Sequence, residues 1–278
     1  MKAMSAINKS ARLPQNQLLA VLLTEISDRI AGYLALVSLP RGAVVYEAGY
    51  AERYVWFPNN AVISLLSVIE NGKSAEIAVV GNEGIVGIDT LTGGRGPCRQ
   101  AVVQSAGTAY SVPARMLKDE FNRHSELRWL ILRYIQSLFA QVSQTAVCNR
   151  HHSIEQQFCR KLLLSLDCQS GDELTLTQGK IADLLGVRRE GVTAAAGTLR
   201  KRGVIEYQRG RIRVLDREKL ETLSCECYAV VKAECERLRP ISSGFDETGE
   251  TPWTHVDRSQ NVSVLRRYQP GAPGNYLI

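Results

Sequence analysis

The stretch from Leu174 to Asp216 constrains the fold of this 278-residue chain more tightly than any other. Thr177 is a good N-cap for a short helix, and Gly186 permits the tight turn that ends it. The apolar residues of that helix that would face inward are Ile181, Leu184 and Leu185. Val187 completes the turn, and a second helix is expected from about Arg188 to Arg202. The pattern therefore predicts a helix-turn-helix unit.

The second helix has one apolar face and one polar face. The apolar residues recur at spacings of three and four, as a buried stripe requires, and they are Val192, Ala195, Ala196 and Leu199. The opposite face carries Arg189, Glu190, Thr193, Ala194, Gly197 and Arg200. In a helix-turn-helix unit the second helix enters the major groove, and its N-terminal residues reach base edges. Arg189 can bind guanine O6 and N7, and Glu190 can accept from cytosine N4.

Two glycines, Gly191 and Gly197, interrupt this second helix. Inside a helix each costs roughly 0.8–1.0 kcal/mol relative to alanine. Two compensating reasons stay open at this point. Either the helix backbone approaches a DNA duplex closely, or it packs tightly against a neighbouring helix.

A basic hairpin is expected after the second helix. The runs Val204–Tyr207 and Arg211–Val214 flank Gln208-Arg209-Gly210, which predicts a β-wing that can lie along phosphates. Between residues 188 and 213 there are eight basic and two acidic residues, in a chain whose net charge is +6. This concentration of charge indicates a polyanionic partner. Asp216 is expected to cap a last helix, from Arg217 to about Leu238.

The amino-terminal half reads as a helix followed by many short strands. A helix-like segment runs from Gln17 to about Tyr33, and turn residues then break the chain at close intervals. The clearest hairpin is Ala61–Val80, in which Asn71-Gly72 is expected to form a type I′ turn. Short strands at this spacing predict a small β-barrel or jelly roll.

A long helix is expected from Ser125 onward. Its mostly apolar seam consists of Leu127, Ile131, Tyr134, Leu138 and Gln141, and is widened by Leu130, Ile135, Phe139 and Val142. A seam this wide can serve the β-domain and a second copy of the helix at once. The core helix of a monomer is the open alternative. Ser153 and Gln156 have the spacing of a capping box, so a new helix should begin there.

Composition excludes several protein classes. With 45% hydrophobic and 22% charged residues, the chain is typical of a globular protein. It has no apolar run long enough to cross a bilayer and no cleavable leader, so no membrane partner and a cytoplasmic location are expected. No phosphate-cradling glycine loop with a lysine, nucleophile elbow or carboxylate pair is present, so an enzyme is not expected. Residues 1–15 and 240–278 read as tails.

The string from Leu176 to Leu220 resembles the winged helix-turn-helix of the Crp/Fnr family of transcription regulators. The matching positions are Thr177, Ile181, Ala182, Leu185, Gly186, Arg189, Glu190, Val192, Gly203, Ile205, Gly210, Ile212, Val214 and Asp216. The resemblance implies an α+β protein with a jelly-roll-like β-roll related to cyclic-nucleotide-binding domains (16–124), a dimerisation helix (125–152) and a DNA-binding domain (153–239). It also implies a homodimer that reads a pseudo-palindromic site in double-stranded DNA and contacts RNA polymerase.

The residues that we expect at the DNA are Thr177, Arg188, Arg189, Glu190, Thr193, Arg200, Lys201, Gln208, Arg209 and Arg211. Arg189 and Glu190 match the principal base-contacting pair of the family. The chain departs from the family at two positions. Arg188 replaces a common serine cap, and Ala194 replaces a common arginine. The preferred DNA sequence is therefore not predicted.

The resemblance also identifies a ligand position in the β-roll, at Gly84, Gly87, Arg99 and Gln100. Family members that sense cyclic AMP hold the ribose with a Gly-Glu pair, but Ile85 stands here and cannot accept a hydrogen bond. A cyclic nucleotide is therefore not the expected effector, and no cofactor is predicted. Absence of cysteine before Cys98 argues against the iron–sulfur centre of oxygen-sensing relatives.

Two cysteine groupings are open to a metal or redox interpretation. One is Cys148 with His151, His152 and Cys159, and the other is Cys225 and Cys227 with Cys235. For the first group, buried helix thiols and interdomain polar contacts are the favoured interpretation. The second group is not favoured as a site, because Cys225 and Cys227, spaced i, i+2 on a helix, point to different faces. No metal site is predicted.

A second function class remains open beside DNA binding. The chain would then be a signal-sensing or protein-interaction module whose winged helix no longer contacts DNA, as the missing arginine at Ala194 allows.

Overall fold

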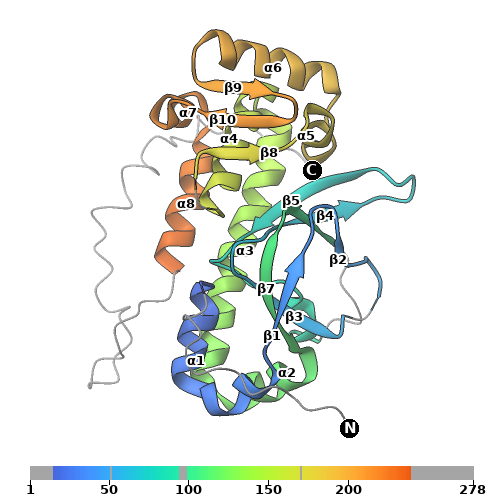
Figure 1. The fold of residues 1–278 in the computed structure, drawn as a ribbon, viewed down its shortest axis with the longest axis vertical. Coiled ribbons are helices and arrows are strands. Elements are labelled where there is room, and N and C mark those ends of the chain that lie inside the picture. Colours follow the sequence, from blue (N-terminus) through green and yellow to red (C-terminus); the bar gives the residue numbers. More distant parts are fainter. Residues whose placement is uncertain (1–14, 51, 94–98, 170, 239–278) are drawn as a thin grey trace, which may run out of the picture. The chain divides into compact units, whose positions relative to one another are not determined.

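A first helix is followed along the chain by seven strands, a short helix and one long helix, and then by a group of shorter helices with a small sheet (Figure 1). The computed structural model describes residues 15–50, 52–93, 99–169 and 171–238, and the side chains of residues 23–28 are outside this description. The predicted α+β class with a β-roll, a long helix and a winged helix-turn-helix is confirmed. The predicted tails lie outside the described residues, apart from Gln15.

Seven strands build two antiparallel sheets in the amino-terminal half. They are β1 (Ala35–Leu39), β2 (Val44–Tyr46), β3 (Tyr54–Pro58), β4 (Val62–Val68), β5 (Ser74–Val80), β6 (Gln100–Ser105) and β7 (Gly107–Pro113). One sheet has the order β1-β7-β3 and the other the order β2-β6-β4-β5. A core that includes Phe57 and one that includes Ile63 fill this half. The apolar residues of the predicted roll are therefore buried in two clusters that pack against its two sheets.

The hairpin of β4 and β5 is present, but its turn differs from the predicted one. Ile69 N donates to Lys73 O, and Gly72 N donates to Ile69 O, so the loop holds three residues. Gly72 has φ +79°, whereas Asn71 does not have a positive φ. The type I′ prediction was wrong because Asn71 Oδ1 accepts from Lys73 N and the bulge at Gly72 takes the left-handed conformation.

Two helices pack beside the roll. α1 (Gln17–Ile30), continued by a short 3-10 turn (Ala31–Tyr33), matches the predicted helix. Buried Asn16 donates to Pro58 O and Gly84 O and accepts from Leu19 N, so it anchors the start of α1 to the roll. α2 (Ala114–Arg123) was not predicted, because it is short and follows β7 without a turn signal.

The long helix α3 spans Ser125–His151. All five residues of its predicted seam are buried: Leu127, Ile131, Tyr134, Leu138 and Gln141. Gln141 contributes a polar contact, since its Oε1 accepts from Val79 N at 2.6 Å. Of the residues predicted to widen the seam, Phe139 is exposed instead.

α4 (Ile154–Asp167) begins directly after α3, with only His152 and Ser153 between them. The predicted capping box is present: Ser153 Oγ accepts from Gln156 N, and Gln156 Oε1 accepts from Ser153 N. These two bonds fix where α4 starts.

The end of the described chain forms two helices and not the single helix that was predicted. α7 covers Arg217–Leu223 and α8 covers Glu226–Leu238. Asp216 caps α7 as predicted, because its side chain accepts from Lys219 N. Ser224 is extended (ψ 168°) and breaks the helix, and Figure 1 shows α8 running beside α3, which it contacts.

The winged unit comprises α5 (Gln178–Leu185), α6 (Arg189–Lys201), β8 (Glu173–Thr175), β9 (Ile205–Gln208) and β10 (Arg211–Val214). Its core extends into the roll, where Val62, Leu66 and Val79 of β4 and β5 belong to the same buried cluster as α4 and α5. The winged unit is thus docked on the β4–β5 hairpin. Within the described ranges, no helix has the length and apolar character needed to cross a bilayer.

Candidate nucleic-acid interface

α5 and α6 meet at the tight turn that the sequence predicted. Thr177 caps α5, since its hydroxyl accepts from Lys180 N at 3.2 Å. Gly186 has φ +66° at the C-cap, a left-handed conformation in which glycine is not strained. Val187 N then donates to Ala182 O. The Thr177 cap and the Gly186 turn therefore define where α5 begins and ends and how the chain enters α6.

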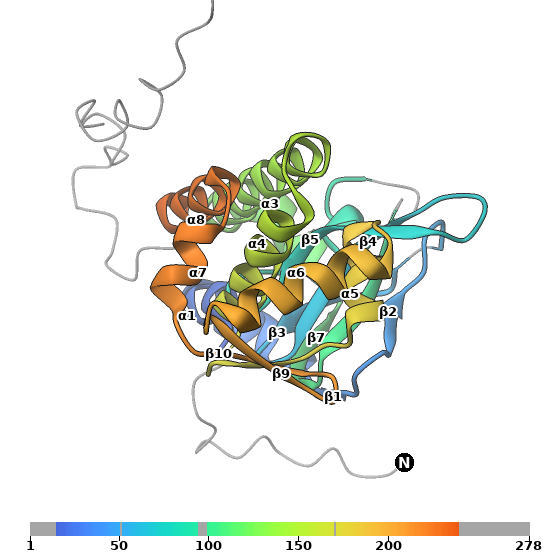
Figure 2. The ribbon, with the colours of Figure 1, turned by 90° about the horizontal axis from the view of Figure 1, so that it is seen from above.

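α6 presents its polar face outward. The predicted stripe of Val192, Ala195, Ala196 and Leu199 is buried. Arg189 and Glu190, at the amino end of the helix, are exposed, as are Arg200 and Lys201 at its other end. Figure 2 shows α6 on the near face of the described chain, in front of the sheets of the roll. Arg189 and Glu190 are thus free to meet a partner on that face.

Thr193 is exposed, but its hydroxyl is engaged within the protein. Its Oγ1 donates to Gln178 Oε1 at 2.8 Å and lies 3.0 Å from Arg189 O. Thr193 thereby links α6 to the first residue of α5. Arg188 occupies the N-cap position of α6 and makes no side-chain capping bond there, so its guanidinium is not used to start the helix.

The two glycines of α6 have different surroundings. A Cβ on Gly191 would lie 2.6 Å from Ile154 Cδ1, whereas a Cβ on Gly197 would meet nothing within 4 Å. Packing of the Ile154 side chain of α4 therefore accounts for Gly191, because a Cβ there would require the Ile154 δ-methyl group to move. It does not account for Gly197.

β9 and β10 form the predicted wing, and they pair antiparallel across a two-residue turn. Arg209 (φ +48°) and Gly210 (φ +80°) both have positive φ, which is the signature of a type I′ turn. Gln208, Arg209 and Arg211 are exposed at its tip. Tyr207 Oη accepts from Gln178 N at 3.2 Å, so the wing also holds the start of α5 in place.

β8 was not predicted, and it changes the charge of the wing. It pairs with β10, and its Glu173 lies 3.6 Å from Arg211 and 3.5 Å from Arg213. The positive charge of β10 is therefore partly offset. In the part of the chain that the structure describes, no ion pair within 4 Å involves Arg189, Arg200, Lys201 or Arg209.

The four residues predicted to hold a ligand in the roll have partners within the chain. Arg99 Nη2 lies 2.6 Å from Asp89 Oδ1, and Gln100 donates to Glu47 at 2.7 Å. A Cβ on Gly84 would lie 2.8 Å from Tyr134 Oη, and one on Gly87 would lie 2.8 Å from Tyr54 O. These glycines provide close packing. Burial, with the charge of Asp89 adding to it, also raises the pKa of Tyr46 beside Arg99.

The structure regroups the cysteines that the sequence placed in two sets. Cys148 and His152 lie with Cys225 and Cys227, and the ligand atoms of these four residues are all within 4.8 Å of one another. Cys159 and Cys235 do not belong to this group. The break at Ser224 accounts for the difference, because Cys225 precedes α8 and is not on the same helix as Cys227.

Comparison with known proteins places the winged unit among regulators. Residues 156–223 match the family described as the Crp-like helix-turn-helix domain. The global nitrogen regulator of Nostoc sp. strain PCC 7120 is 24% identical over 183 residues, which is 63% of this chain and 82% of that protein.

Solved structures of Crp/Fnr regulators share the fold. A transcriptional regulator of the Crp/Fnr family from Eubacterium rectale superimposes with a TM-score of 0.60 at 17% identity, over 74% of this chain and 96% of that one. FixK2 from Bradyrhizobium japonicum gives 0.59 at 14% identity, over 69% and 98%. The architecture is thus that of these regulator structures, and the Crp-like helix-turn-helix match includes both α5 and α6.

Proposed function

We propose that this chain, whose helix-turn-helix matches the Crp-like family model and whose fold is that of Crp/Fnr regulators, reads a pseudo-palindromic DNA site as a homodimer through α6. The carrying observation is the exposure of Arg189 and Glu190 at the amino end of α6. The buried stripe on the opposite side of α6 fixes which way these two side chains face. A guanidinium and a carboxylate so placed can distinguish guanine and cytosine in the major groove.

Phosphate contacts would come from the rest of the same face. Arg200 and Lys201 at the end of α6, and Arg209 at the tip of the wing, are exposed and unengaged by the ion pairs described above. Thr177, Arg188, Thr193, Gln208 and Arg211 complete the proposed contact set. Gly197, with open space around its Cα, would let the helix backbone approach the duplex.

An exposed apolar row on α3 supports the dimer. Its members are Trp129, Leu132, Phe139 and Val147, all exposed in the single chain. At 3.6 residues per turn these four positions fall within an arc of about 80° on the helix surface. A second α3 packed against this row would remove it from water, as in a two-stranded coiled coil.

We propose RNA polymerase as a further partner and the cytoplasm as the location, by analogy with the regulators that this chain resembles. The effector that controls the regulator is not identified by the β-roll, where Arg99 and Gln100 already have partners.

The test is selection of bound DNA from a random pool, followed by titration of the selected site. The enriched site should be a pseudo-palindrome, and affinity should fall steeply with salt through counterion release. Arg189→Ala should lose about 1–3 kcal/mol of binding free energy at one base position of each half-site. Arg115→Ala, an exposed arginine on α2, is the matched control and should bind normally.

Neutralising Arg200, Lys201 and Arg209 together distinguishes DNA binding from the interaction-module alternative. Retention on DNA should disappear in this triple variant. Enrichment of no sequence from the pool, or salt-independent binding with full retention by Arg189→Ala, would reject the proposal.

A further inference from the structure

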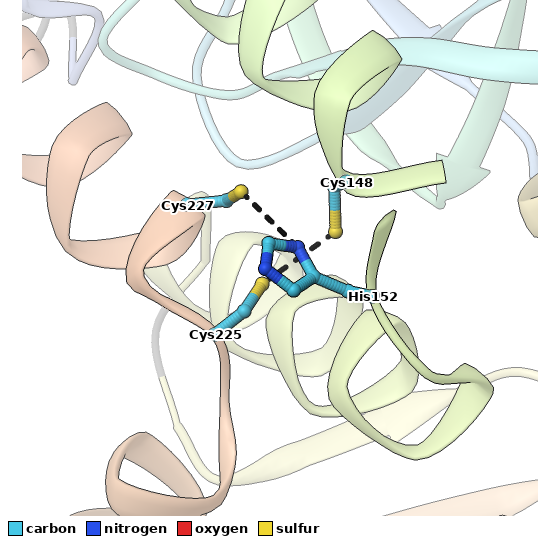
Figure 3. Close-up of side chains that lie close together, drawn as sticks. All are labelled: Cys148, His152, Cys225 and Cys227. Carbon is cyan, nitrogen blue, oxygen red and sulfur yellow. Dashed lines mark hydrogen bonds between the residues drawn. The ribbon is translucent and has the colours of Figure 1, made fainter. Parts of the chain in front are cut away.

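Four side chains that bind metals well meet where the long helix ends. Cys148 and His152 come from the last turn of α3 and the residue after it, and Cys225 and Cys227 come from the start of α8 (Figure 3). We propose that these four residues bind one Zn²⁺ ion in a tetrahedral Cys₃His site.

The observed distances agree with tetrahedral zinc. With Zn–S of about 2.3 Å and Zn–N of about 2.0–2.1 Å, tetrahedral angles place two sulfurs roughly 3.8 Å apart and a sulfur and a nitrogen roughly 3.5 Å apart. Cys148 Sγ lies 3.5 Å from Cys225 Sγ, and Cys227 Sγ lies 3.6 Å from His152 Nδ1. Four ligand atoms within 4.8 Å of one another are close enough to share a single ion. A cluster of several irons needs its cysteines farther apart.

His152 is oriented as a zinc ligand would be. Its Nδ1 faces Cys227, while its Nε2 lies 3.3 Å from Glu226 Oε1. A proton on Nε2 shared with this carboxylate leaves the lone pair of Nδ1 directed at the sulfurs. A carboxylate behind the ligating imidazole is the usual arrangement at protein zinc sites, where it fixes the tautomer. Glu226 lies between the two cysteines in sequence and supplies this contact.

Local structure explains why the four residues converge. Cys148 lies in the last turn of α3, and His152 N, at the C-cap, donates to Cys148 O, so the two residues stay close together at the end of the helix. Ser224 breaks the helix before Cys225, so Cys225 and Cys227 are not held on one regular helix, where an i, i+2 pair would diverge. Tyr228 N donates to Cys225 O, which places both thiols at the amino end of α8. That end of a helix favours thiolates.

Ordinary hydrophobic packing does not account for the group. The three thiols form a buried cluster of their own, and no aliphatic or aromatic side chain of the described residues joins it. By contrast, Cys159 and Cys168 lie within a large apolar core. Arg160 is buried and close enough to Cys148 to act on it electrostatically, so it would offset the net negative charge of one Zn²⁺ with three thiolates.

An access route for the ion also exists. A surface groove of about 440 Å³ along α7 and α8 is lined by Cys225 and Glu226, among others. The bound ion would join α8 to the end of α3 directly beside the connection to α4. It would therefore help to fix the orientation of the winged unit. The importance of this orientation for regulation rests on the proposed DNA binding.

The experiment measures metal on the full chain, without DNA. The protein is made in zinc-supplemented medium, purified under reducing conditions and desalted. Inductively coupled plasma mass spectrometry should then find one zinc per chain. Replacement by Co²⁺ should give the intense visible bands of a tetrahedral site together with a thiolate-to-cobalt charge-transfer band. Cys148→Ser and Cys227→Ser should each lose the ion, whereas Cys159→Ser, which removes a buried thiol outside the site, should keep it.

Two further variants test the role of the histidine. His152→Cys should keep the zinc in a Cys₄ site, and His152→Ala should lose it. Glu226→Gln should weaken zinc binding by about 10–100-fold, because the imidazole loses its carboxylate. If a serine variant fails to fold, the cobalt spectrum of the unaltered chain still decides the question.

Three results would overturn the zinc site. They are a chain that takes up neither zinc nor cobalt, a chain that holds a different metal, and a Cys148–Cys225 disulfide in place of a metal, seen as the loss of two hydrogens in the intact mass. Failure of Arg189→Ala to affect DNA binding would leave these metal measurements untouched, so the two proposals fail separately.

Discussion

Lys161 Nζ lies 2.5 Å from Glu76 Oε1 and 2.7 Å from Glu76 Oε2, with the side chains only 3% and 9% exposed. The ammonium also donates to Gln104 Oε1, and Ser64 Oγ donates to Glu76. All three ammonium protons therefore have acceptors. Because Lys161 belongs to α4 and Glu76 to β5, this buried pair joins the β-roll to α4, against which the winged unit packs.

Removing one member of this pair should destabilise the chain strongly. Glu76→Ala leaves the Lys161 ammonium buried without a counter-charge, and we expect a loss of about 3–5 kcal/mol in the free energy of unfolding, measured by urea denaturation. Glu155→Ala breaks an exposed pair with Arg202 and should cost only about 0–1 kcal/mol. Equal effects for the two variants would contradict the assignment. The double variant Glu76→Leu, Lys161→Met should be less destabilised than Glu76→Ala.

Features that depend on neighbours along the chain were predictable from the sequence. The buried stripe of α6, the turn at Gly186 and the capping box at Ser153 all follow from spacings of three or four residues, and each is present. Such features depend on helix geometry and backbone donors, which act within one turn.

Features that depend on distant contacts were not predictable. The partner of Lys161 lies 85 residues away, and the thiols of Cys148 and Cys225 meet across 77 residues. After the break at Ser224, α8 packs against α3, and β8 pairs with β10, which lies more than 30 residues further along the chain. No local sequence pattern indicates contacts between residues so far apart. The buried pair and the metal-ligand group could therefore be found only in the three-dimensional structure.

Gly197 should lower the stability of the chain while allowing DNA to approach the backbone of α6 closely. Gly197→Ala adds a methyl group into open space and should raise the free energy of unfolding by roughly 0.8–1.0 kcal/mol, while lowering affinity for the selected DNA site. Thermal denaturation and fluorescence anisotropy measure the two effects. Gly191→Ala should stabilise less than Gly197→Ala, because its methyl group would force the Ile154 δ-methyl group to move. A Gly197→Ala chain with unchanged DNA affinity would show that the duplex does not approach this glycine.

The exposed row on α3 should be the dimer contact. Phe139 is 65% exposed in the single chain, and Phe139→Glu would place a carboxylate in the interface. For a residue that contributes about 2 kcal/mol, the dimer dissociation constant should rise roughly 30-fold, as measured by sedimentation equilibrium. Leu36→Glu alters a residue of similar exposure (58%) on β1 and should leave the dimer intact. Dissociation by both variants, or by neither, would argue against α3 as the contact.

Stability should fall in alkaline solution because of buried thiols. Burial, with the charge of Glu155 adding to it, raises the pKa of Cys159 from 9.0 to about 12. Between these values the unfolded chain has lost the thiol proton and the folded chain retains it, so the unfolded state binds fewer protons and stability decreases as pH rises. The free energy of unfolding, measured from about pH 8 to about pH 11, should decline less steeply for Cys159→Ala than for the unaltered chain. Parallel slopes would contradict this assignment.

The connection between α3 and α4 has a geometric consequence for a symmetric pair of chains. Only His152 and Ser153 separate the two helices, and each has two soft backbone dihedral angles. A small rotation at this joint would occur in both chains of a symmetric dimer. The distance between the two α6 helices would then change by the sum of the two displacements. Since that distance must match one turn of duplex, roughly 34 Å, a few degrees at two residues decide whether both half-sites are met at once.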